Sequence, residues 1–303
     1  GKRGGTGVRA GFSPCHPAVS FLYFALVIGF SMVLTHPACL MISLCGAAAC
    51  LIAQRGWRGA AGTLWYVLPV VLLATVVNPA FSHRGATVLA YLPSGNPLTL
   101  ESIAYGIGAG AMLAAVLLWF SCFSQVMTTD QLVYLFGRII PALALVLSMT
   151  LRFVPRFTRQ LRKVSQAQQS LGQDGEENGR WGKVRRAVTA LSVVVTWALE
   201  NAVDTADSMR ARGYGLPGRT AFSIYRMERR DVRVLLWLAL GGLTLLIGSV
   251  MGGLSWRYYP TLQGGRTPAL TAILLLTELA LCLLPAILHW KEERAWRRSR
   301  SAN

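Results

Sequence analysis

The sequence predicts an all-α, polytopic membrane protein with about six transmembrane helices and long cytoplasmic helices. Hydrophobic residues make up 53% of its 303 residues and charged residues only 14%, whereas soluble domains carry about 25% charged residues. Residues 10–54 contain no Lys, Arg, Asp or Glu, which leaves room for two spans of about 20 residues each. The net charge of +17 is concentrated outside the apolar segments.

The charge-free stretch contains a turn signal near its middle, at Thr35-His36-Pro37. Proline disfavours a helical conformation in the residue before it, so we expect two spans joined by a tight turn. A cleaved signal peptide is the alternative for the first span, because basic residues precede it. A second apolar segment follows at once without a small-residue cleavage site, which favours the membrane hairpin.

Four more apolar segments are free of Lys and Arg and long enough to cross a bilayer. Glu278 is the one formal charge in the last of them. An acid inside a span is costly and usually faces other helices or a cavity, so Glu278 has either a packing role or a place in a pathway. The six expected spans cover residues 18–34, 38–53, 63–77, 102–124, 234–255 and 268–288.

Basic residues orient these spans, because cytoplasmic loops carry an excess of Lys and Arg. With six spans, all but three of the 30 Lys and Arg residues lie on one side; the exceptions are Arg84, Arg257 and Arg266. We therefore expect both termini in the cytoplasm. The predicted domains are 1–124 with four spans, a cytoplasmic domain over 125–233, and 234–303 with two spans and a basic tail.

The cytoplasmic middle is predicted to contain three helical pieces. The first, 132–150, is apolar but contains Arg138 and Pro141, and a span there would destroy the charge bias. We expect it at the membrane surface or as a re-entrant piece. The second, 151–171, places basic residues on one face, where they are expected to contact anionic lipid headgroups. These basic residues are Arg152, Arg156, Arg159, Arg162 and Lys163, and the apolar stripe is Phe153, Phe157, Leu161 and Val164.

The third piece follows a polar loop at 172–182 and runs over about 183–212, or about 45 Å. Gly213 suits a left-handed helix stop, and Arg210 and Arg212 lie where the carbonyl end of a helix favours cations. Its acidic strip is Glu200, Asp204 and Asp207, and its apolar positions are Val188, Leu191, Val195, Ala198, Ala202, Ala206 and Met209. Small residues at Gly106, Gly108, Gly110, Gly248 and Gly252 permit close helix approach in the spans.

Several classes of function lack their signals. There is no G-x-x-x-x-G-K-[ST] phosphate loop, so we expect no nucleotide hydrolysis by this chain, and we expect it to be non-catalytic. Metal-ligand spacings are missing and the six cysteines mostly fall within spans, so no metal site, cofactor or disulfide framework is expected. The basic charge without a groove-reading domain argues against nucleic acid as a partner.

Three stretches carry a resemblance: "TLRFVP" at 150–155, "AQQSLG" at 167–172 and "ALENAVDTADSMRARGYGLPGR" at 198–219. They resemble the transmembrane T component of energy-coupling-factor (ECF) importers of vitamins and metal ions. The resemblance implies a bacterial plasma-membrane subunit that joins two cytoplasmic ATPase subunits to a substrate-binding membrane subunit. Its long cytoplasmic coupling helices would end in short arginine-centred motifs that dock on the ATPases.

The resemblance assigns docking to the ends of the second and third cytoplasmic helices. Arg210, Ala211, Arg212 and Gly213 match the second motif, with Arg212 as its central arginine. Ser170, Leu171 and Gly172 occupy the first motif, where Leu171 stands in place of the usual arginine. Two other hypotheses remain at this stage: a self-contained membrane carrier or enzyme working without ATPases, and a membrane scaffold.

Overall fold

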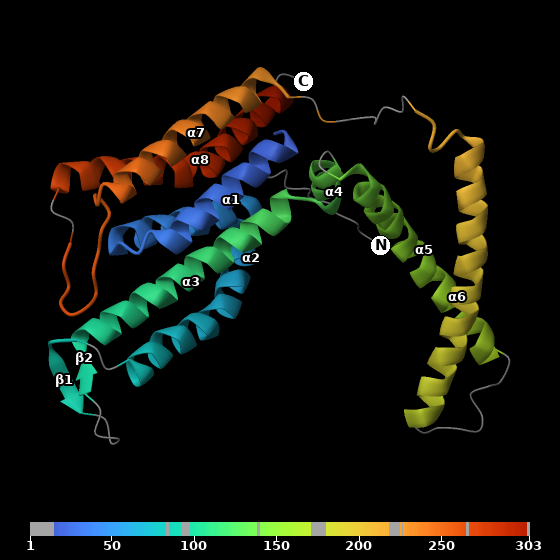
Figure 1. Cartoon of the computed structure of the whole chain (residues 1–303), viewed down its shortest axis with the longest axis horizontal. Coiled ribbons are helices and arrows are strands. Elements are labelled where there is room, and N and C mark those ends of the chain that lie inside the picture. Colours follow the sequence, from blue (N-terminus) through green and yellow to red (C-terminus); the bar gives the residue numbers. More distant parts are fainter. Residues whose placement is uncertain are drawn as a thin grey trace. The chain divides into compact units, whose positions relative to one another are not determined.

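The computed structural model describes residues 15–82, 85–91, 97–137, 140–170, 180–217, 225, 227–264 and 267–301. Within them lie eight helices and one two-stranded antiparallel sheet (Figure 1). The chain forms two compact units, one of residues 1–131 with 225–303 and the other of residues 132–224. The elements are α1 (Pro17–Val33), α2 (Pro37–Phe81), β1 (Val88–Tyr91), β2 (Pro97–Thr99), α3 (Leu100–Val126), α4 (Thr129–Gly137), α5 (Pro141–Ser170), α6 (Arg180–Ala211), α7 (Arg229–Val250) and α8 (Pro268–Ser301).

The helices confirm the predicted all-α polytopic membrane fold. Five described helices are long and apolar enough to cross a bilayer, and α1 is a shorter apolar helix. Four of the five belong to the first unit; the fifth, α6, is the least apolar, and its last third carries Asp204, Asp207 and Arg210. Each of these charges would be costly in a bilayer core, and the placement of α6 outside the membrane stays a prediction.

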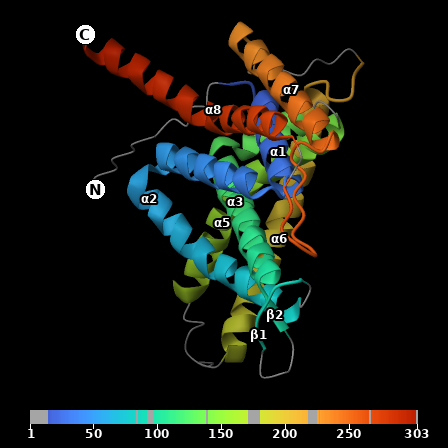
Figure 2. The same cartoon turned by 90° about the vertical axis from the view of Figure 1, so that its left-hand side faces the viewer.

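The tight turn between the first two spans is confirmed. α1 ends at Val33, α2 begins at Pro37, and His36 Nδ1 accepts a hydrogen bond of 3.2 Å from the Ala38 N–H. The expected second and third spans lie in the two halves of α2, which bends at Gly56 (Figure 2). Gly56 has φ +71°, a left-handed conformation that glycine adopts without a steric penalty.

Polar and aromatic contacts join α1, α2, α3 and α8 in the core of the first unit. Trp119 Nε1 donates to Ser43 Oγ at 3.0 Å, and Ser43 and Ser31 hydroxyls share a 2.5 Å hydrogen bond. Tyr23 donates to the Leu281 carbonyl at 3.1 Å, and its ring lies edge-on to Trp119. Between membrane helices, such hydrogen bonds replace the hydrophobic driving force that lipid cannot supply.

The acid inside the last span faces the protein interior, as expected. Glu278 on α8 is 3% exposed, and α8 packs against α2 and α7. Five of the six cysteines are buried, as expected of small apolar side chains, and Cys45 is exposed.

Close packing at glycines holds the second half of α2 against α3, as the small residues predict. A Cβ atom at Gly106 would lie 2.6 Å from the Thr75 carbonyl oxygen, and Gly248 on α7 would similarly meet Leu274 on α8. For Gly252 the prediction of close helix packing is wrong. This glycine follows the end of α7 with φ +82°, a conformation that ends the helix. α7 therefore stops at Val250, before the predicted residue 255.

Two connections of the first unit meet at one end of its helices, an arrangement that the sequence did not predict. Tyr258, in the α7–α8 connection, donates to the Thr35 carbonyl at 3.0 Å and lies edge-on to Tyr105 of α3. Glu101, in the first turn of α3, accepts a 2.9 Å hydrogen bond from the Thr87 hydroxyl just before the β1–β2 hairpin. These contacts fix the hairpin and the α7–α8 connection to the helices.

In the second unit, the predicted break between residues 150 and 151 is wrong. α5 is one helix from Pro141 to Ser170, and Pro141 occupies its first position, where no backbone N–H is needed. The sequence changes from apolar to basic at Arg152, but this change alters the surface of the helix and not its backbone. α4 forms a separate short helix before it.

Candidate functional site

The C-terminal end of α6 is closed by a Schellman motif, as its glycines suggested. The Gly213 N–H bonds to the Arg210 carbonyl at 2.9 Å, and the Tyr214 N–H bonds to the Met209 carbonyl at 3.0 Å. This pattern requires a left-handed residue, and Gly213 has φ +76°. The backbone therefore leaves the helix axis directly after Arg212, so that this arginine is presented on a compact helix tip.

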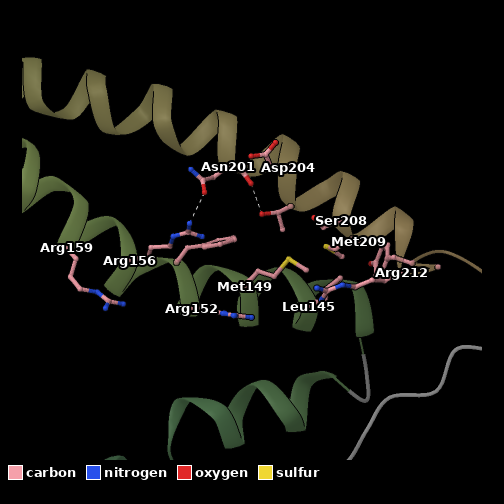
Figure 3. A pocket seen from close by; sticks show the side chains of 14 residues that line it. Leu145, Met149, Arg152, Arg156, Arg159, Asn201, Asp204, Ser208, Met209 and Arg212 are labelled. Atoms are coloured by element: carbon pink, nitrogen blue, oxygen red, sulfur yellow. Dashed lines mark hydrogen bonds between the residues drawn. The ribbon is translucent and has the colours of Figure 1, made fainter.

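The two arginines at this end have different surroundings. Arg210 lies 3.9 Å from Asp207 in an exposed i, i+3 ion pair on the side of the helix. Arg212 is exposed and makes no ion pair with any residue in the described part of the chain. The Arg212 side chain points from the end of α6 toward α5 (Figure 3). Of the two, Arg212 is thus available to a partner without breaking an existing contact.

Helices α5 and α6 cross in antiparallel directions at an aromatic and polar contact (Figure 1). Arg156 donates to Asn201 Oδ1 at 2.9 Å, and its guanidinium lies 5.1 Å from the centre of the Trp197 ring. Phe157 packs edge-on against the same ring at 5.9 Å. Trp197 and Asn201 were not singled out from the sequence, although their i, i+4 spacing places them on one helix face.

The face of α6 that packs on α5 differs from the predicted apolar stripe. Ala190 and Val194 are buried and continue the row of Trp197 and Asn201 at helical spacing. The predicted positions Val188, Leu191 and Val195 are exposed within the described residues. α6 is apolar on two faces, and periodicity alone does not indicate which of the two packs against the neighbouring helix.

A groove of about 880 Å³ opens between the two helices toward the Arg212 end of α6 (Figure 3). Its charged residues are Arg152, Arg156 and Arg159 from α5, Asp204 from α6, and Arg212 directly after α6. The remaining lining is Leu145, Met149, Phe153, Asn201, Thr205, Ser208, Met209, Gly213 and Tyr214. Three arginines of the predicted basic face therefore line a concave site between the helices.

Ser170 and Arg212, one residue from each predicted docking motif, lie at opposite ends of the helix pair. Ser170 is the last residue of α5, where its hydroxyl donates to the Gln166 carbonyl at 3.0 Å. Leu171 and Gly172 lie outside the described residues. Along the helix axes, Ser170 lies about 20 Å beyond Arg156, and Ala211 about 15 Å beyond Asn201 in the other direction.

Comparison with known protein families matches residues 15–222 to the family described as CbiQ, cobalt transport protein. The chain belongs to this family. The CbiQ match covers helices α1 to α6, whereas α7 and α8 lie beyond it.

Curated relatives agree with the CbiQ assignment. The chain is 31% identical over 196 residues to the energy-coupling factor transporter transmembrane protein EcfT of Listeria innocua, covering 59% of this chain and 72% of the relative. It is 26% identical over 201 residues to EcfT of Bacillus selenitireducens, covering 61% and 73%. It is 36% identical over 110 residues to EcfT of Lacticaseibacillus paracasei, and this match spans 36% of the chain and 40% of the relative's length.

Proposed function

We propose that the chain is the transmembrane energy-coupling subunit of an ECF-type importer for vitamins or metal ions. Membership of the CbiQ family and similarity to EcfT proteins carry this proposal, and they give no support to a self-contained carrier or enzyme. Two cytoplasmic ATPase subunits and a substrate-binding membrane subunit complete the complex. The substrate-binding subunit chooses the cargo.

The crossed helices α5 and α6 transmit motion in this proposal. ATP binding brings the two ATPase subunits together, and the ends of the helices follow them. Because the contact at Arg156, Trp197 and Asn201 joins the helices at their crossing, displacement of their ends becomes tilting of the crossed pair. Such rigid-body movement of packed elements is a common form of transmission in proteins.

Arg212 anchors one ATPase subunit by entering a groove on its surface. A guanidinium bonds carboxylates or carbonyls with a planar fork, and the small neighbours Ala211 and Gly213 let the backbone approach closely. The other end, Ser170-Leu171-Gly172, docks through apolar contact at Leu171. The two ATPase contacts are therefore chemically unequal.

Recovery of the ATPase subunits with a tagged chain tests this assignment. Arg212→Ala should lower recovery sharply, because removing one partner of a buried charged contact costs about 2–5 kcal/mol. Arg210→Ala is the matched control. It removes the same charge two residues from Arg212, and the Arg210 side chain is already paired with Asp207. Full recovery with Arg212→Ala, or equal loss with both variants, would reject the docking role of Arg212.

The chain itself is proposed to be non-catalytic, because it lacks a phosphate-binding loop. It resides in the plasma membrane with both termini in the cytoplasm. Purified free of partners, it should not hydrolyse ATP, and addition of the two ATPase subunits should supply the activity. Hydrolysis by the contaminant-free chain would reject this part of the proposal.

A further inference from the structure

The groove between α5 and α6 carries more positive charge than its own residues neutralise. Four arginines line it, and Asp204 is the one acid among the described lining residues. Arg156 is held by neutral partners, the Asn201 amide and the Trp197 ring. A concave surface with unbalanced charge of one sign concentrates ions of the opposite sign.

The groove is also amphipathic. Leu145, Met149, Phe153 and Met209 supply an apolar part of the lining next to the arginines. Figure 3 shows Leu145, Met149 and Arg152 following one another along α5, with Met209 and Arg212 approaching from α6. A fully hydrated anion would not use the apolar part of such a surface. An amphiphile with an anionic head would bury its apolar part there.

The surface of α5 changes from apolar to basic at Arg152, which lines the groove. Residues 141–151 contain no charged side chain, and Leu143 and Val146 are about 60% exposed within this stretch. The first arginine of the helix follows directly at 152. An exposed apolar segment adjoining a row of cations is the arrangement of a helix at a membrane interface, where guanidinium groups meet lipid phosphates.

We propose that this groove binds the phosphate of an anionic phospholipid headgroup. Arg152 and Arg159 hold the phosphate oxygens by forked hydrogen bonds, and Met149 and Phe153 contact the glycerol backbone and first acyl carbons. The proposal narrows the expected contact of a basic helix face with lipid to one defined site. It does not rest on docking of Arg212 to an ATPase subunit.

Lipid titration of the purified full-length chain in detergent, followed by native mass spectrometry, tests the site. The probes are phosphatidylglycerol, phosphatidylcholine and inorganic phosphate. The double variant Arg152→Gln/Arg159→Gln should bind phosphatidylglycerol on the order of tenfold more weakly than the parent chain. The control Arg162→Gln/Lys163→Gln removes the same charge from exposed positions of α5 outside the groove lining, and its affinity should stay within about twofold of the parent value.

Each alternative gives a different pattern. Equal weakening by both double variants, or equal affinity for phosphatidylcholine, would reduce the site to a general basic surface and overturn the proposal. Inorganic phosphate binding as tightly as phosphatidylglycerol would assign the groove to a free anion. Unchanged lipid affinity combined with loss of ATPase recovery only in the Arg152→Gln/Arg159→Gln variant would assign it to a protein partner.

A second double variant keeps the test decisive if the glutamine variant does not fold. Arg152→Lys/Arg159→Lys preserves the charge but not the forked geometry, so its phosphatidylglycerol affinity should be intermediate. Parent-like affinity in this folded variant, together with an equal response to salt in all variants, would show simple charge attraction and reject a defined phosphate site.

Discussion

Arg156 on α5 and Asn201 on α6 are joined by a 2.9 Å hydrogen bond at the crossing of the two long helices of the second unit. The same guanidinium lies over the Trp197 ring, so a charged, an amide and an aromatic side chain meet at one point. The ends that carry the docking motifs lie on either side of this point. In the proposed coupling, a contact at the crossing controls how displacement of one end is passed to the other.

A double-mutant cycle on Arg156→Gln and Asn201→Ala should reveal coupling between the two residues of about 0.5–1 kcal/mol, the range of exposed charged and cation–π contacts. Thermal unfolding of the purified chain measures it. Arg162→Gln combined with Asn201→Ala is the control pair, because Arg162 makes no hydrogen bond with Asn201 among the described contacts. Additive effects of Arg156→Gln and Asn201→Ala would contradict the coupling.

Gly213→Ala should destabilise the tip of α6 by about 1–2 kcal/mol, because at φ +76° an added Cβ lies too close to the backbone carbonyl oxygen. Gly213→Asn is the matched control, since asparagine tolerates this conformation and should lose less. Hydrogen exchange at the Tyr214 amide, which bonds to the Met209 carbonyl, reports the motif directly. Identical exchange in both variants would show that the conformation of Gly213 is not limiting.

Gly106→Ala should destabilise the chain even though alanine is the better helix former. Its Cβ would lie 2.6 Å from the Thr75 carbonyl oxygen, so α3 must move away from α2. Gly29→Ala is the matched control, because no atom lies within 4 Å of its added Cβ, and it should be neutral or stabilising by up to about 1 kcal/mol. Thermal unfolding in detergent compares them. The packing argument fails if both variants behave alike.

Cysteine labelling tests the orientation of the membrane helices. In a cysteine-free background, Asn178→Cys should react with a membrane-impermeant maleimide only after the cells are permeabilised, because 27 of the 30 Lys and Arg residues favour a cytoplasmic middle. Gln263→Cys, at an exposed position in the α7–α8 connection, should react in intact cells. Labelling of Asn178→Cys in intact cells would show that the predicted orientation is wrong.

Much of the fold followed from the sequence because apolar length and charge clustering are strong signals in membrane proteins. The turn at His36-Pro37 and the helix stop at Gly213 were predicted correctly from local backbone chemistry. The bounds of α5 were not, because polarity changes at Arg152 while the backbone continues. The β1–β2 hairpin was also missed, since its strands are short and neither alternates clearly between apolar and polar residues.

The candidate site was predictable only in part. The resemblance located Arg212, and glycine chemistry explained why a helix ends there. The contact of Arg156 with Trp197 and Asn201 was not predicted, because it depends on how α5 and α6 cross, and Arg156 and Asn201 lie 45 residues apart in sequence. A single sequence gives the apolar faces of α6 but not which of them meets α5.

The unequal lengths of the membrane helices set a condition on the bilayer. α1 has 17 residues and reaches about 25 Å, whereas α3 has 27 residues and reaches about 40 Å. The two helices contact each other, so one lipid environment must accommodate both. Against a hydrocarbon core of about 30 Å, we expect α3 to accommodate its excess length by tilting and the bilayer beside α1 to thin locally. We therefore expect short-chain lipids to gather around α1.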